Sequence, residues 1–154
     1  MTDLHCHILP AIDDGAKNAK VSMELLRMQN DAGITDIVCT PHFNPDSQNL
    51  EGFIDKRSAR YLADYVFRSE LPVRLKFGAE VRISPTILDL DFLPLCFQKT
   101  KVMLLEMPRT LRPQWDTNVI YQLTLGGVIP LIAHIERYPY VQKNPNIALD
   151  WIEA

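Results

Sequence analysis

Two histidines separated by one residue, and two adjacent aspartates soon after them, lie at the start of this chain. His5 and His7 flank Cys6, and Asp13 and Asp14 follow. Imidazole nitrogens and carboxylate oxygens are the ligands that Zn²⁺, Mn²⁺ and Fe²⁺ take in proteins. Taken alone, the histidine pair also fits a polar loop after a first strand, so its meaning depends on the rest of the chain.

The hydrophobic pattern predicts the elements that would position these residues. Short β-branched runs alternate with longer segments of helical period, which indicates strand-helix repeats around a parallel sheet in one α/β domain, residues 1–154. The predicted strands cover residues 2–7, 34–40, 73–81, 101–107 and 128–134. Helices are predicted from an N-cap at Asn18 to Gly33, over residues 50–70 and over residues 114–127, with one or two short helices within residues 84–100.

The spacing of apolar residues also predicts which helix faces are buried. In the first helix the predicted face comprises Val21, Leu25, Leu26 and Met28. In the helix over residues 50–70, the residues at spacings of three and four are Phe53, Ile54, Arg57, Tyr61, Leu62 and Tyr65.

Each predicted strand ends in, or is closely followed by, a side chain able to bind a metal. The candidate ligands are His5, His7, Asp14, His42, Glu80, Glu106 and His134, a set that includes all 4 histidines of the chain. Because the carboxyl ends of parallel strands lie on one face of a sheet or barrel, we expect these side chains to converge. Each residue alone has an ordinary alternative role, such as an ion pair, a helix cap or a turn.

The chemistry of this set favours a site with two or three metal ions. It holds more ligands than one ion can use, and its mixture of imidazole and carboxylate suits Zn, Mn or Fe(II). Several carboxylates facing one another would also repel, which would raise their pKa values unless cations neutralise them.

Composition excludes several other classes of protein. A net charge of −3 and a pI near 5.8 provide no basic surface for a nucleic-acid backbone. No stretch approaches the roughly 18 apolar residues of a membrane span, and no signal peptide is recognisable. The 3 cysteines are widely spaced and odd in number, which indicates reduced thiols. We therefore expect a cytoplasmic protein without nucleic-acid partners or membrane insertion.

Other catalytic motifs are absent from the sequence. A thiol-based tyrosine phosphatase needs an arginine six residues after its cysteine, but Ile12, Pro45 and Val102 stand at those positions. There is no His-Glu-x-x-His zinc motif, since Tyr138 stands where the second histidine would be, and no glycine-rich loop ends in Gly-Lys-Ser/Thr. Strand alternation predicts that Cys6 points away from its neighbouring histidines into the core.

The segments "DLHCHILPAIDDGAKN", "TPHF", "GAEV", "LLEMP" and "AHIERYPYVQKNP" resemble, in order and spacing, the PHP (polymerase and histidinol phosphatase) superfamily. They are most similar to bacterial protein-tyrosine phosphatases of capsule and exopolysaccharide operons, the CpsB/CapC type. The resemblance implies a TIM-like (β/α)7 barrel with up to three divalent metal ions, commonly Mn²⁺. It also implies hydrolysis of phosphotyrosine on the tail of a tyrosine autokinase that controls polysaccharide synthesis.

The resemblance further implies a role for each candidate residue. His5, His7 and Glu80 would hold one ion, and Glu80 would bridge to a second, completed by Glu106 and His134. Asp14 and His42 would belong to the third ion. Arg137 matches an arginine placed against the substrate phosphate.

The chain departs from this pattern at its C-terminal end. It ends at Ala154, before the late Asp-x-His motif that supplies further ligands in proteins of this type. We therefore expect an incomplete barrel that lacks its C-terminal strands. The open edges of its sheet would favour a homo-oligomer. We also expect the missing ligands to impair the activity.

Two further readings stay open, and so does the role of two arginines. The protein is alternatively another PHP-type phosphoesterase, such as a histidinol phosphatase, or a catalytically impaired relative that serves as a binding or regulatory protein. Arg109 and Arg112 either help to select an acidic phosphorylated tail or are solvated loop residues.

Overall fold

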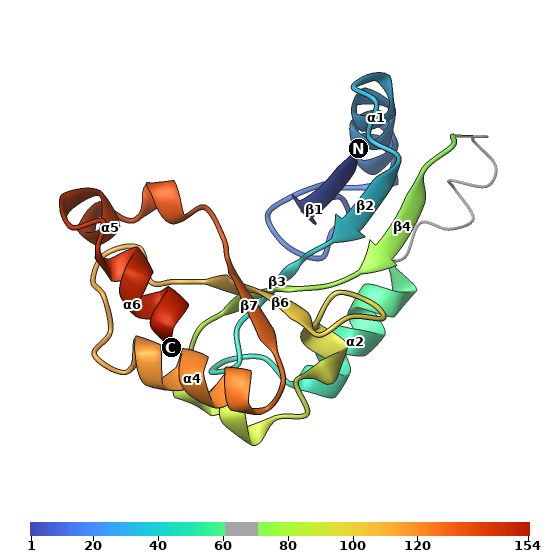
Figure 1. Cartoon of the computed structure of the whole chain (residues 1–154). Helices are drawn as coiled ribbons and strands as arrows, with labels where there is room; N and C mark the ends of the chain where they lie inside the picture. The colour runs from blue at the N-terminus through green and yellow to red at the C-terminus, as the bar shows by residue number, and fades with distance from the viewer. Residues whose placement is uncertain (61–70) are drawn as a thin grey trace.

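The protein has a mixed α/β fold, and its computed structural model describes residues 1–60 and 71–154 (Figure 1). In chain order the elements are β1 (Thr2–Cys6), α1 (Ala19–Asp31), β2 (Asp36–Cys39), β3 (His42–Phe43), α2 (Leu50–Ala59), β4 (Arg74–Phe77), β5 (Glu80–Arg82), η1 (Pro85–Asp89), η2 (Leu93–Leu95), β6 (Val102–Glu106), α4 (Asp116–Leu125), β7 (Ile129–Ile132), η3 (Ile135–Arg137), α5 (Pro139–Lys143) and α6 (Ile147–Glu153). Among the described residues, no helix has the length and apolar character that crossing a membrane requires.

The strands form two parallel sheets rather than one. The first has the order β1-β2-β4 and the second the order β3-β5-β6-β7, and every described pairing is parallel. The strand-helix rhythm of the sequence thus correctly predicted a parallel α/β protein. It did not predict the division into two sheets.

The single strand predicted over residues 73–81 is wrong, because the chain changes sheets within it. Gly78 separates β4 from β5, and a side chain at this position would meet Val38 Cγ1 at 2.8 Å and Phe97 Cδ1 at 2.9 Å. The neighbouring segment makes the same step at Pro41, which separates β2 from β3. Pro41 cannot donate a backbone hydrogen bond, so a regular ladder cannot continue through it.

The first helix confirms its predicted N-cap but corrects one face residue. Asn18 Oδ1 accepts a hydrogen bond from Val21 N at 3.1 Å, and Gly33 after the helix has φ of 80°. Leu26 is fully buried, whereas Met28 is 67% exposed. Met28 lies two residues from Leu26 and therefore on the other side of the helix.

The other predicted helices agree with the structure where it describes them. α2 covers the first part of the helix predicted over residues 50–70 and buries Phe53 and Arg57. Tyr61, Leu62 and Tyr65 lie outside the described residues. α4 ends before Gly126 and Gly127, as predicted, and residues 84–100 contain the short helices η1 and η2.

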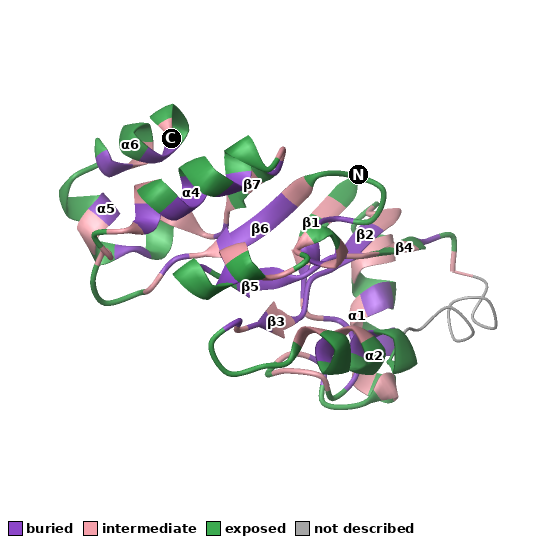
Figure 2. Ribbon diagram, turned by 90° about the horizontal axis from the view of Figure 1, so that it is seen from below, coloured by how far each residue is buried: buried purple, intermediate pink, exposed green. Residues whose placement is uncertain are grey.

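Two main hydrophobic clusters support the sheets (Figure 2). The larger packs the four-stranded sheet against α4 and the C-terminal helices, with Met103, Leu105, Leu123, Tyr138 and Trp151 among its buried members. The smaller packs β1 and β2 against α1, around Ile8, Leu9, Leu26 and Ile37. The inner ends of β1 and β2 point toward the four-stranded sheet in Figure 1. Residues at those ends can therefore meet residues of both sheets.

Candidate metal centre

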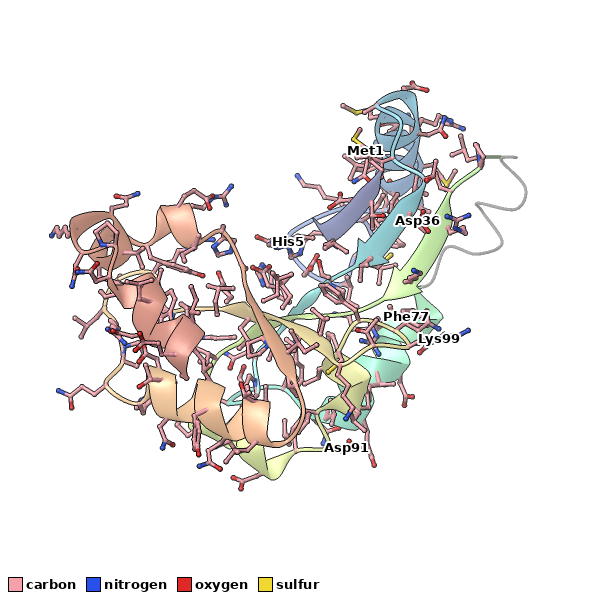
Figure 3. The ribbon with its side chains drawn as sticks, viewed as in Figure 1. Met1, His5, Asp36, Phe77, Asp91 and Lys99 are labelled. Carbon is pink, nitrogen blue, oxygen red and sulfur yellow. The ribbon has the colours of Figure 1, made fainter. Side chains whose placement is uncertain are left out.

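The predicted site residues lie together where the two sheets meet. A pocket of about 390 Å³ is lined by His5, His7, Asp14, Gly15, His42, Glu80, Arg109, His134 and Arg137. His5 lies near the inner end of β1, facing the second sheet (Figure 3). Glu106 completes the predicted set, with Oε2 at 3.9 Å from His42 Nδ1. Residues far apart in the sequence therefore converge, as the parallel-strand argument predicted.

Two of these residues begin strands of the second sheet, which the sequence did not predict. His42 begins β3 and Glu80 begins β5, and the two are partners in the register of these parallel strands. His42 follows β2, as predicted, whereas Glu80 was predicted to end a strand and does not. Instead the chain has just stepped from the first sheet into the second, at Pro41 and at Gly78.

Glu80 is the centre of the cluster. Its carboxylate is buried, and Oε2 lies 3.0 Å from His5 Nε2, 2.9 Å from His7 Nε2 and 3.3 Å from His42 Nδ1. Oε1 lies 2.8 Å from His134 Nε2. One buried carboxylate therefore faces every histidine of the chain.

The donor atoms form overlapping groups that have the compactness of metal sites. Each group has its ligand atoms within 4.8 Å of one another, and the groups are His5-His7-Glu80, His7-Asp14-His42 and His42-Glu80-Glu106. His134 Nε2 extends the last group, at 3.8 Å from Glu106 Oε1. The geometry thus supports the predicted grouping of ligands, while their binding of ions stays a prediction.

The buried carboxylates of the site favour a positive charge beside them, which shows in the pKa values of Glu80 and His7. Burial favours the neutral form of Glu80, but hydrogen bonds with His5 and His7 outweigh it and hold the pKa of Glu80 well below its usual range. Burial likewise opposes a charge on His7, yet its hydrogen bonds with Asp13 and Glu80 raise the pKa of His7 to about 10. Positive charge is therefore stabilised at the place where cations are expected.

The residues present fit a metal ion. His5 Nε2 and His7 Nε2 are 3.1 Å apart and both face Glu80 Oε2. Two nitrogens bound to one ion at roughly 2.0–2.1 Å lie about 3 Å apart, so this spacing suits a shared ion. Imidazole and carboxylate together suit zinc, manganese or iron.

Sequence reasoning missed two residues that hold the site in place. Asp13 was noted in the sequence but not selected, and its Oδ2 lies 2.7 Å from His7 Nδ1. Tyr138 is fully buried, and its hydroxyl accepts from Met107 N and donates to Ala133 O, each at 2.9 Å. For Asp13, the only sequence signal was its position next to Asp14. For Tyr138, no sequence signal distinguishes it from an ordinary core residue.

The structure separates the arginines that the sequence could not distinguish. Arg109 and Arg137 line the pocket, and both side chains are exposed. Arg109 also has an amino nitrogen at 3.6 Å from Glu106 Oε1. Arg112 instead binds Asp116 at 2.7 Å and Asp150 at 2.6 Å. It therefore links α4 to α6 and does not face the pocket.

Cys6 packs in the core, as predicted from strand alternation. It belongs to the smaller hydrophobic cluster, and its Sγ lies 3.1 Å from Gln29 Nε2. Burial raises the pKa of its thiol to about 12, so the nucleophilic thiolate is disfavoured.

His134 has an unusual backbone conformation next to the pocket. Its φ is 33° and its ψ is 49°, in the left-handed region that non-glycine residues rarely adopt. Such strain persists where surrounding contacts enforce it, and it is common at functional sites. Here the ring of Tyr138 lies 5.6 Å from the ring of His134.

Comparison with known proteins agrees with this geometry. Tyrosine-protein phosphatase YwqE of Bacillus subtilis is 34% identical over 156 residues, which cover 99% of this chain and 61% of the relative. The putative tyrosine-protein phosphatase CapC of Staphylococcus aureus is 28% identical over 160 residues, again covering 61% of the relative. This chain therefore spans about three fifths of the length of the curated relatives it matches.

A solved structure and a family model give the same result. The structure comes from crystallographic work on YwqE from Bacillus subtilis and CpsB from Streptococcus pneumoniae, described as unique metal-dependent tyrosine phosphatases. It superposes with a TM-score of 0.83 at 31% identity and covers 99% of this chain and 63% of the other. The model for capsular polysaccharide synthesis proteins, CpsB/CapC, matches residues 1–153. The chain thus belongs to the CpsB/CapC family.

Proposed function

We propose that this chain is a metal-dependent phosphatase that hydrolyses phosphotyrosine in a protein. The observation that carries the proposal is the convergence of imidazoles and carboxylates on Glu80, with Arg109 and Arg137 beside them in the same pocket. The relatives named tyrosine-protein phosphatases support the choice of substrate. The chemistry that the pocket favours is therefore transfer of a phosphoryl group to water.

In the proposed site, divalent ions are held by three groups of residues. His5, His7 and Glu80 would hold the first ion, Glu80 with Glu106 and His134 would hold the second, and Asp14 with His42 would hold the third. Mn²⁺ is the ion we propose, and Zn²⁺ or iron also suits these ligands. Divalent ions bound there supply Lewis acidity and a source of hydroxide near neutral pH.

The chain's own residues orient the substrate. The guanidinium groups of Arg109 and Arg137 can each bind two phosphate oxygens and stabilise the charge that develops on them. Because the tyrosyl oxygen leaves as a phenolate, the reaction needs no strong general acid from the protein.

The substrate we propose is the phosphotyrosine tail of a bacterial tyrosine autokinase that controls capsule or exopolysaccharide synthesis. Membership of the capsular polysaccharide synthesis family supports this assignment. The free thiols of Cys6, Cys39 and Cys96 support the expectation of a reducing, cytoplasmic environment.

We also propose that the two sheets are part of a single-domain TIM-like (β/α)7 barrel. β1 and β7 are at the edges of their sheets, and Leu4, Ile129 and Leu131 on these strands are exposed. Edge strands with exposed apolar side chains favour pairing with further strands. A homo-oligomer joined through these edges is therefore part of the proposal.

The test is hydrolysis of a tyrosine-phosphorylated peptide by the purified protein with Mn²⁺. We expect EDTA to abolish the release of phosphate and added Mn²⁺ to restore it. Glu80→Gln should lower the rate at least about 100-fold, since it removes a central ligand and loss of outer partners alone costs 10–100-fold. Glu51→Gln, at an exposed position of α2, is the matched control and should keep the wild-type rate.

Two results would refute the proposed function. One is a rate that does not change with the chelator. The other is a preference for histidinol phosphate over the phosphopeptide, which would favour another phosphoesterase of this superfamily.

A further inference from the structure

Asp13 lies behind His7, outside the residues that line the pocket. Its carboxylate is almost fully buried, and three groups donate hydrogen bonds to it. Oδ2 lies 2.7 Å from His7 Nδ1 and 3.0 Å from the backbone nitrogen of His42. Oδ1 accepts from Gly15 N at 3.0 Å.

The contact with Asp13 decides which nitrogen of His7 carries the hydrogen. An ionised carboxylate only accepts hydrogen bonds, so Nδ1 of His7 must be the protonated nitrogen. In the neutral ring, the lone pair is then on Nε2. This Nε2 faces the pocket, at 2.9 Å from Glu80 Oε2 and 3.1 Å from His5 Nε2.

The same carboxylate joins two segments that carry candidate ligands. The loop after β1 contains His7, and β3 begins at His42, whose backbone nitrogen Asp13 binds. Gly15 keeps this loop close to His7, because a side chain there would lie 2.2 Å from the carbonyl oxygen of His7. A shift of Asp13 would therefore move ligands of both segments.

We infer that Asp13 is a positioning residue of the metal centre. It fixes His7 in the tautomer that presents Nε2 to the pocket and couples the placement of His7 to that of His42. The inference rests on the proposed metal site. The two adjacent aspartates then have different roles: Asp13 positions ligands, and Asp14 is a candidate ligand. The side chain of Asp14 is 82% exposed, and its Oδ1 lies 3.4 Å from His42 Nε2.

Asparagine has the same shape as Asp13 but cannot accept all three of these hydrogen bonds. Three N–H groups point at the two carboxylate oxygens of Asp13, whereas an amide has only one oxygen. In one orientation the amide NH₂ opposes Gly15 N–H. In the other orientation the amide NH₂ faces His7 Nδ1 and favours the tautomer with hydrogen on Nε2. In that tautomer Nε2 has no lone pair with which to bind a metal ion.

The experiment measures Zn²⁺ binding to the full chain by calorimetry and the His7 ring by ¹⁵N NMR of the Zn²⁺-loaded protein. We expect Asp13→Asn to bind Zn²⁺ about 10–100-fold more weakly than wild type, as for other outer partners of ligating histidines. Wild-type His7 should carry hydrogen on Nδ1 and bind Zn²⁺ through Nε2, and a smaller fraction of the variant should show this pattern. Asp31→Asn, at an exposed position at the end of α1, is the matched control and should behave as wild type.

The inference is overturned if Asp13→Asn binds Zn²⁺ with wild-type affinity. It is also overturned if His7 of the wild-type protein binds Zn²⁺ through Nδ1, a result that needs no variant and holds even if the substitution prevents folding. Far-UV circular dichroism shows whether the Asp13→Asn variant folds. If the wild-type protein binds no Zn²⁺ or Mn²⁺ at all, the metal site itself is refuted and the inference falls with it.

Discussion

Replacing Tyr138 by phenylalanine removes a single hydroxyl that ties the end of β6 to the end of β7. That hydroxyl accepts from Met107 N and donates to Ala133 O, each at 2.9 Å. The aromatic ring stays, stacked 5.5 Å from Tyr140 and edge-on to Trp151 at 6.3 Å. The substitution therefore tests the hydrogen bonds without creating a large cavity.

The expected cost follows from the two groups that lose their partner. Both belong to the backbone in the buried part of the four-stranded sheet, since Met107 and Ala133 are buried. Leaving one buried polar group unsatisfied costs about 1–3 kcal/mol. We therefore expect Tyr138→Phe to lower the free energy of unfolding by about 2–6 kcal/mol, a large part of the 5–15 kcal/mol typical of a domain.

Urea denaturation followed by circular dichroism measures this loss, and Tyr140→Phe is the matched control. Tyr140 is half-buried, and its hydroxyl makes one hydrogen bond, to Pro108 O at 3.0 Å. Its removal should cost about 0.5–1.5 kcal/mol. If Tyr138→Phe costs no more than Tyr140→Phe, the bridging hydroxyl does not hold these strand ends together and the argument is wrong.

The remaining predictions concern the pocket and the loop beside it. Arg109→Ala should raise the KM for a phosphotyrosyl peptide by about tenfold, roughly 1.4 kcal/mol, with an unchanged urea midpoint. Arg112→Ala should instead lower stability by about 2 kcal/mol, because the buried Asp116 keeps its hydrogen bond from Trp151 but loses its charged partner. An equal effect of both variants on KM would contradict this division. Gly15→Ala should cost at least about 1–3 kcal/mol and weaken Mn²⁺ binding, since its Cβ would collide with His7. Gly52 lies in α2, and a Cβ there would meet no atom closer than 3.6 Å, so Gly52→Ala should stabilise the protein by up to about 1 kcal/mol. If both alanine variants gave equal denaturation midpoints, the steric argument would fail.

The sequence predicted the convergence of the site because that convergence follows from a general rule. Parallel strands bring their carboxyl ends to one side, so metal-binding residues at successive strand ends must approach one another. His5, Glu106 and His134 follow this rule closely, because each lies within two residues of the end of β1, β6 or β7. The rule requires only the hydrophobic pattern and the residue types, both of which a sequence displays.

Other features depend on contacts that a sequence does not display. Asp13 and Asp14 are adjacent and chemically identical, yet one is buried behind His7 and the other is exposed at the pocket. Arg109 and Arg112 differ in the same way, because only Arg112 reaches the acidic residues of α4 and α6. In both pairs the three-dimensional path of a loop decides the role.

The steps between sheets at Pro41 and Gly78, which the strand prediction did not foresee, also position two residues of the site. Pro41 directly precedes His42, and Gly78 lies two residues before Glu80. At each step the chain leaves the first sheet and begins a strand of the second, which brings His42 and Glu80 into register with each other. Had β4 continued as one regular strand, Glu80 would have stayed in the first sheet, away from Glu106 and His134. The breaks in the ladders therefore place one carboxylate where ligands from both sheets can share it.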